Sequence, residues 1–233
     1  MGASRELHGK RRRWRVTLLT AVSLLSIASS ALAQGWDPQT EPETNGPLFA
    51  NGDASCGGGE AKTPQGEVAA ESSACVWWFE YLPALETDLQ RDHGVLWLQT
   101  TFTPRDGFCL VGVTVHLGAD PESFRIESWM PDEGRGRTRP GVADFSMTTD
   151  AGGNGLQEAS VLATAVPQQR GTSRTVAPGK NGVLEYRWTA ARPTTEQVNA
   201  VVAVEVSWSA DLPGSLLRLY GLGIGLRSTV TEC

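Results

Sequence analysis

Two glutamates in the last third of the chain could form a catalytic pair of carboxylates. Glu185 and Glu205 each stand on the polar side of a strongly alternating segment, and we expect the two segments to be neighbouring strands. Glycoside hydrolysis needs two carboxyl groups about 5–9 Å apart, one as acid and the other as base or nucleophile. Sheet surfaces also carry such residues as plain ion pairs without chemistry. A secreted glycan hydrolase using Glu185 and Glu205 is therefore an alternative function, and the preferred interpretation assigns no catalytic residue.

Other enzyme signatures are missing from the sequence. There is no Gly-x-Ser-x-Gly motif for a serine hydrolase. Glycines 221, 223 and 225 alternate inside a strand pattern and lack the spacing of a dinucleotide-binding loop. The sequence thus favours a role that is not catalytic, leaves enzyme activity open, and predicts no cofactor.

Metal ligands are sparse and scattered. His93 and His116 are the only histidines after residue 33, and they form no His-x-His or His-x-x-x-His pair. Asp144, Asp150 and Asn154 surround a glycine pair without the regular alternation of a calcium loop, which indicates a turn. We predict no metal site.

Tryptophans are the most promising binding residues. Trp77, Trp188 and Trp208 stand on the apolar faces of their segments, which places them in the core. Trp78, Trp97 and Trp129 stand on the opposite faces, so we predict that these three bind a ligand. An exposed indole stacks on a sugar ring or anchors a protein partner. The competing interpretation is that a second sheet covers them.

Three arginines alternate in a segment rich in glycine and proline. Arg135, Arg137 and Arg139 are expected in a mobile, exposed loop, because glycine and proline interrupt strands. We do not expect them to form a polyanion site.

The first 33 residues have the pattern of a signal peptide. A basic segment holds Arg5 and five further basic residues up to Arg15, residues 16–28 are mostly apolar, and residues 31–33 (Ala-Leu-Ala) fit a cleavage site. The apolar run is too short for a membrane span of about 20 residues. We predict a secreted or periplasmic protein, by the general or the twin-arginine route, with no stable membrane insertion after cleavage.

The charge balance limits the partners. Six of the 20 basic and one of the 26 acidic residues lie in 1–33, which leaves 14 and 25 and a net charge of −11. Such a surface repels phosphate backbones, so nucleic acid is not an expected partner. The expected partner is an unidentified glycan or protein.

All four cysteines follow the predicted cleavage site, and an even number in an exported chain predicts two disulfides. We predict Cys56–Cys75, which ties the preceding arm to the first strong strand. The second bond is then Cys109–Cys233, which anchors the last residue and requires Cα atoms within about 7 Å.

Alternating apolar residues predict the fold. Residues 34–74 are expected to be a loop-rich N-terminal arm, and residues 75–233 one β domain. Segments 95–102 and 108–117 are predicted to form a hairpin across the Pro104–Gly107 turn, and the last third a β-meander that includes 199–209. The fold class is therefore an antiparallel β-sandwich or jelly roll.

The preferred function is a disulfide-stabilised binding or structural module outside the cell or in the periplasm. A second alternative, a small outer-membrane β-barrel, depends on residues 219–226, where large apolar residues alternate with glycine as in lipid-facing strands.

Overall fold

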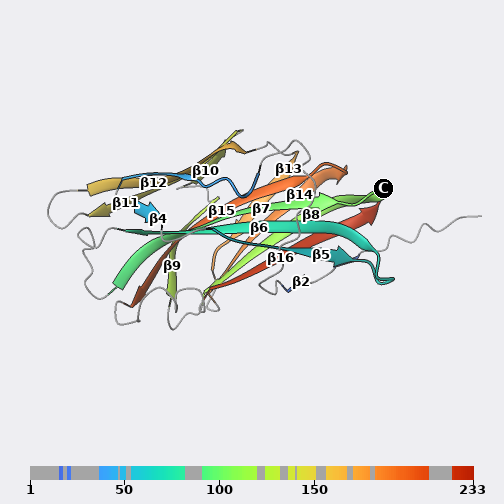
Figure 1. The fold of residues 1–233 in the computed structure, drawn as a ribbon, viewed down its shortest axis with the longest axis horizontal. Helices are drawn as coiled ribbons and strands as arrows, with labels where there is room; N and C mark the ends of the chain where they lie inside the picture. The colour runs from blue at the N-terminus through green and yellow to red at the C-terminus, as the bar shows by residue number, and fades with distance from the viewer. Residues whose placement is uncertain are drawn as a thin grey trace, which may run out of the picture.

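The computed structural model is all-β in every part of the chain that it describes (Figure 1). These parts are residues 16–17, 20–21, 37–46, 48–50, 54–81, 91–119, 124–131, 136–139, 141–150, 156–166, 170–178, 182–209 and 222–233. The strands pair antiparallel in three sheets, and no helix occurs within these ranges. The predicted all-β antiparallel class is confirmed.

The middle sheet supplies one face to each of two cores. Its strand order is β4 (Leu48–Ala50), β6 (Val68–Tyr81), β7 (Arg91–Pro104), β15 (Val198–Ser209) and β9 (Phe124–Met130), with β5 (Ser55–Lys62) also paired to β6. We call it the middle sheet because its strands are apolar on both sides, as the sequences of β7 and β15 show.

The two outer sheets cover opposite faces of the middle sheet. The β8 sheet has the order β1 (Val16–Thr17), β16 (Leu222–Glu232), β8 (Phe108–Ala119), β14 (Val183–Thr194) and β13 (Gly171–Val176), with β2 (Thr20–Ala21) also paired to β16. The small sheet has the order β10 (Gly136–Arg139), β11 (Gly141–Asp150), β12 (Leu156–Val166) and β3 (Glu43–Asn45).

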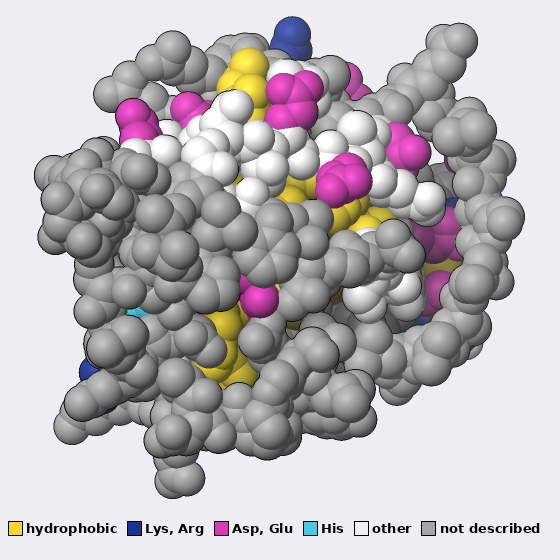
Figure 2. All heavy atoms as spheres, turned by 60° about the vertical axis from the view of Figure 1, so that its left-hand side comes forward, with side chains coloured by type: hydrophobic (Ala, Val, Ile, Leu, Met, Phe, Trp, Pro, Cys, Tyr) yellow, Lys and Arg dark blue, Asp and Glu magenta, His cyan; other side chains and the backbone are white. Residues whose placement is uncertain are grey.

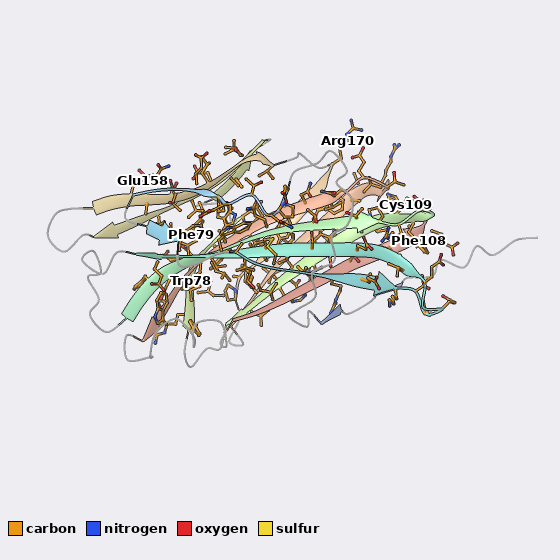
Figure 3. All side chains as sticks on the ribbon, in the orientation of Figure 1. Trp78, Phe79, Phe108, Cys109, Glu158 and Arg170 are labelled. Atoms are coloured by element: carbon orange, nitrogen blue, oxygen red, sulfur yellow. A yellow bond between two sulfur atoms is a disulfide. The ribbon has the colours of Figure 1, made fainter. Side chains whose placement is uncertain are left out.

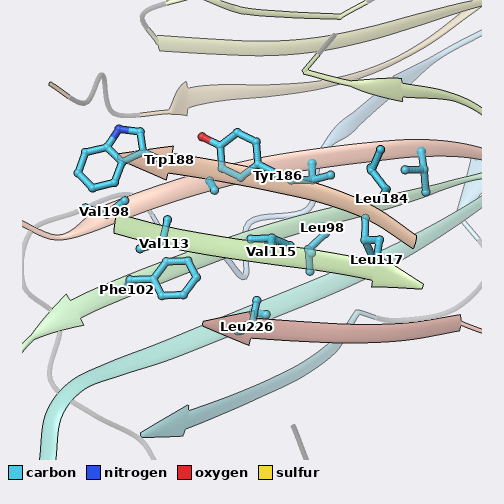
Figure 4. Close-up of a cluster of buried hydrophobic side chains, with 14 of the residues drawn as sticks. Leu98, Phe102, Val113, Val115, Leu117, Leu184, Tyr186, Trp188, Val198 and Leu226 are labelled. Carbon is cyan, nitrogen blue, oxygen red and sulfur yellow. The ribbon is translucent and has the colours of Figure 1, made fainter. Parts of the chain in front are cut away.

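Alternation along one strand divides its side chains between the two cores. In β7, Leu96 and Leu98 belong to the first core, between the middle sheet and the β8 sheet (Figure 4). Val95 and Trp97 belong to the second core, between the middle sheet and the small sheet. A strand buried on both faces stabilises both layers at once, since burial contributes about 25 cal/mol per Å² of apolar surface.

The predicted hairpin of β7 and β8 is wrong. The turn itself forms, with the Phe108 amide donating to the Arg105 carbonyl at 2.9 Å and Gly107 at φ 83°. The chain then passes from the middle sheet to the β8 sheet, and each strand pairs with two others. Two apolar strands joined by a tight turn can either pair edge to edge or pack face to face. Their own alternation does not distinguish these arrangements.

The predicted meander is also wrong, because β14 and β16 flank β8 in the β8 sheet and β15 lies in the middle sheet.

The Arg-rich segment differs from the predicted loop as well. Arg137 and Arg139 lie in strand β10, paired with β11, and Arg135 lies outside the described residues.

The N-terminal arm contains more strand than predicted. Residues 55–62 form β5, and β6 begins at Val68 and runs past residue 74. Glycines favour turns, yet those at 57–59 pair in β5 with residues 72–74 of β6. A Cβ on Gly58 would lie 2.7 Å from the Ser72 carbonyl oxygen, so a residue without a side chain suits this close approach.

Both predicted disulfides are confirmed. Cys56 and Cys75 are directly opposite in β5 and β6, with Cα atoms 4.1 Å apart. Cys109 and Cys233 have Cα atoms 5.4 Å apart, and the Cys233 amide donates to the Gly107 carbonyl at 3.0 Å. The second bond therefore fixes the residue after β16 at the beginning of β8. Two disulfides fit an oxidising compartment such as the periplasm or the extracellular space.

Candidate ligand-binding surface

Two of the three candidate tryptophans lie at the ends of one row across the middle sheet. The register aligns Trp78 of β6 with Leu96, Leu96 with Val204, and Val204 with Trp129 of β9. Directly paired residues share a sheet face, and this row faces the first core, where Leu96 and Val204 are buried. Trp78 and Trp129 are only half-buried. They are three strand spacings apart, about 14 Å.

Trp208 supports one end of this row. Its ring centroid lies 5.2 Å from that of Trp78, with the ring planes inclined by 52°. Both indoles lie over Gly94, where a Cβ would come within 2.9 Å of Trp78 Cζ2 and 3.2 Å of Trp208 Cη2. Because Trp208 is buried in the first core, it holds the half-buried Trp78 in place.

A carboxylate lies next to the indole of Trp78. The Trp78 Nε1 donates a hydrogen bond to Glu80 Oε1 at 2.9 Å. The two residues are on the same side of β6, since they are two positions apart. This bond orients the indole and places a charged acceptor at its edge. We call Trp78, Glu80, Trp129 and Trp208 the indole surface.

The indole surface lies toward the end of the molecule opposite Cys109, as the position of Trp78 in Figure 3 shows. Figure 2 brings this end forward. Hydrophobic side chains are visible there beside several Asp and Glu side chains. An indole beside a carboxylate suits a ligand that has both apolar faces and hydroxyl groups.

Trp97, the third candidate, is not at this surface. It is fully buried in the second core, so its expected exposure is wrong. The small sheet covers this face of β7. The core positions predicted for Trp77, Trp188 and Trp208 are confirmed, at 3%, 5% and 2% exposed. The contact between Trp208 and Trp78 could not be predicted, because it depends on the pairing of three strands.

The two candidate glutamates are not on neighbouring strands. Glu185 lies on β14 of the β8 sheet, and Glu205 on β15 of the middle sheet. Glu185 pairs with Arg187 Nε, and Glu205 Oε2 accepts a hydrogen bond from Ser128 Oγ at 2.6 Å. Each carboxylate therefore has a local partner, and the strand pairing on which the hydrolase alternative depended is absent.

The residues considered from the sequence as metal ligands, and rejected, are also separated. His93 lies on β7 and His116 on β8, in different sheets. Asp144 lies in β11 and accepts a hydrogen bond from Ser146 Oγ at 3.3 Å, while Asn154 is outside the described residues. Within the described ranges, no group of three or more His, Cys, Asp or Glu side chains has the arrangement of a metal site.

The described part of the strand with alternating glycines packs against protein. Leu226 of β16 is buried in the first core, and Ile224 packs against that core. The lipid-facing interpretation is therefore wrong for these two residues, and Leu219 and Tyr220 lie outside the described residues. The nearest atoms to a Cβ on Gly225 belong to His116 of β8. The described residues contain no helix of the length and apolarity needed to cross a membrane.

Comparison with known proteins gives no family. No family model matches the chain, and no curated protein matches it. Among solved structures, it is similar to the Clostridium perfringens NetB toxin in the membrane inserted form. The identity is 6%, the match covers 72% of this chain and 79% of the toxin chain, and the TM-score is 0.35. At this TM-score the likeness carries no argument about function.

Proposed function

We propose that the chain is an exported, disulfide-stabilised β-sandwich module that binds a neutral glycan at the indole surface. The observation that carries this proposal is the pair of half-buried indoles, Trp78 and Trp129, at the two ends of one row. The residues between them, Leu96 and Val204, are fully buried. Covered side chains thus separate the two indoles, and the proposal requires an extended ligand that reaches both of them.

The chemistry of the indole surface favours a sugar over a purely apolar ligand. A pyranose ring presents C–H groups on its faces, which pack on an indole, and hydroxyl groups at its edge, which donate to a carboxylate. Glu80 is held beside Trp78 by the bond from Nε1, so a carboxylate lies at the edge of this indole. The distance of about 14 Å between the indole positions exceeds the size of a single sugar, so we expect an oligosaccharide.

The binding test uses the mature protein and neutral oligosaccharides. Hexasaccharides of glucose and N-acetylglucosamine with defined linkages are titrated by calorimetry. We expect binding to weaken at least tenfold in Trp78→Ala and in Trp129→Ala. Val176→Ala is the matched control, because Val176 is a 38% exposed apolar residue on β13, outside the indole surface.

Two results would contradict the proposal. One is that no neutral hexasaccharide binds the wild type. The other is that Val176→Ala weakens binding as much as the tryptophan variants do. Product release from any bound hexasaccharide would instead favour the hydrolase alternative.

Export is tested separately. Expression of the full chain in a secreting host should give a mature protein that begins at Gln34. Its mass under non-reducing conditions should show two disulfides. Retention of residues 1–33 would contradict the signal peptide.

A further inference from the structure

Three arginines and a threonine form one row across the outer face of the β8 sheet. The register aligns Arg174 of β13 with Arg187 of β14, Arg187 with Thr114 of β8, and Thr114 with Arg227 of β16. Val113 and Val115 are buried in the first core, so Thr114 and its row point to the opposite side of the sheet. The row therefore faces away from the hydrophobic interior.

Such a row is unfavourable without a counter-ion. Arg174 and Arg187 are direct cross-strand partners, and like charges in this position destabilise a sheet. Arg227 is two strand spacings from Arg187, about 10 Å. The chain as a whole has a net charge of −6, so a row of three arginines differs in sign from the protein's overall charge.

The next row supplies one carboxylate. It consists of Val176, Glu185, His116 and Gly225 on the same four strands. Glu185 pairs with Arg187 Nε, and its Oε2 lies 3.6 Å from His116 Nε2. Within the described residues, Arg174 and Arg227 have no ion pair, and the buried Arg227 Nε has no hydrogen-bond partner. One carboxylate thus accompanies three arginines.

We propose that Arg187, Thr114 and Arg227, with Arg174 at the side, bind an oxyanion carried by a ligand, either a carboxylate or a sulfate. A guanidinium group presents paired N–H donors that match the oxygens of either anion. Thr114 lies between the two arginines and adds a hydroxyl donor. A bound anion also removes the repulsion between neighbouring arginines. We call these four residues the arginine row.

His116 should make this binding depend on pH. Burial, together with the charges of Arg227 and Arg187, lowers the pKa of His116 below its usual value of 6.5. The ionisable groups that face it are Glu185 and Arg187 from β14 and Arg227 from β16. An anion on the arginine row favours the protonated imidazole. By linkage, protonation of His116 then favours the anion, and affinity should increase as the pH falls from 7.5 to 5.5.

The experiment uses two anionic probes on the mature protein. Trigalacturonate carries carboxylates, and a heparin-derived tetrasaccharide carries mainly sulfates. Calorimetry at low and high salt should show binding that weakens with salt. Arg227→Gln should weaken it at least tenfold, because the variant lacks one guanidinium group of the arginine row. The variant should fold normally, since Arg227 has no ion pair within the described residues that its loss would break. Arg125→Gln is the matched control, since Arg125 is an exposed arginine on β9.

The pH dependence of binding tests the role of His116, because a purely structural role would not affect it. His116→Gln should bind the tighter probe equally at pH 7.5 and lose the increase at pH 5.5. In the wild type, the imidazole resonance of His116 should titrate at higher pH when the probe is bound. Absence of binding by both probes would overturn the proposal, as would an equal loss in Arg125→Gln. Trp78→Ala should leave this binding unchanged, which separates it from the indole surface.

Discussion

The indole of Trp78 meets that of Trp208 over Gly94, where β7 presents no side chain. A Cβ at residue 94 would also lie 2.7 Å from the Phe79 carbonyl oxygen, which is backbone and cannot move aside. The contact therefore requires glycine at this position.

We predict that Gly94→Ala destabilises the protein by about 1–3 kcal/mol, the usual cost of overpacking. Urea unfolding measures the change, and tryptophan fluorescence should report a disturbed Trp78–Trp208 pair. Gly223→Ala is the control, because a Cβ at Gly223 meets no atom within 4 Å. Equal stability of the two variants would show that the close packing at Gly94 is not required.

The two disulfides should contribute unequally. Cys109–Cys233 spans 124 residues and Cys56–Cys75 spans 19. In the chain-entropy model, these loops correspond to about 5 and about 3 kcal/mol. We predict that Cys109→Ala with Cys233→Ala lowers the free energy of unfolding more than Cys56→Ala with Cys75→Ala. Denaturant unfolding of both double variants tests the order, and the reverse order would refute it.

Tyr186 should limit stability at alkaline pH. Burial raises the pKa of Tyr186 to about 12, although a hydrogen bond from Ser173 opposes the shift. The unfolded tyrosine ionises near 10, so this contribution is complete below pH 10 and is lost as the pH rises through 12. It amounts to about 3 kcal/mol. Phenolate absorbance should show one late-titrating tyrosine that is absent in Tyr186→Phe. Ionisation of every tyrosine near pH 10 in the folded protein would contradict this.

His116 should reduce stability in mild acid. Its pKa is lowered by burial and by Arg227 and Arg187, so the unfolded chain binds more protons near pH 6 than the native protein does. Stability should therefore fall as the pH drops below 6.5, the usual value. His116→Gln should reduce this loss between pH 7 and 5, as thermal unfolding would show. An unchanged pH profile in the variant would exclude His116 as the cause.

Local patterns predicted much of the fold. The alternation in β7 correctly separated Leu96 and Leu98 from Trp97, because a period of two is a property of the strand itself. The disulfide pairs were also predictable, since Cys56 precedes the first strong strand and Cys233 needs an anchor. The faces of β7 and the first disulfide needed only the neighbouring sequence, and the second disulfide then followed as the remaining pair.

The arrangement of strands could not be predicted in the same way. β14 and β15 both alternate strongly, yet they belong to different sheets, which separates Glu185 from Glu205. Trp97 was predicted to be exposed because it lies on the face of β7 opposite Leu96 and Leu98, and the sequence of β7 does not show that the small sheet covers this face. The arginine row was invisible in the sequence, because its four residues come from four strands and meet only in the register.

The position of β8 has a consequence for biosynthesis. β8 ends at Ala119, but its two partners are β14, which begins at Val183, and β16, which begins at Leu222. During synthesis, β8 therefore emerges long before either neighbour, and both of its hydrogen-bonding edges lack their native partners. A chain that crosses a membrane in an unfolded state completes folding on the far side, where every strand is available at once. Until its partners arrive, both edges of β8 are open to pairing with another chain.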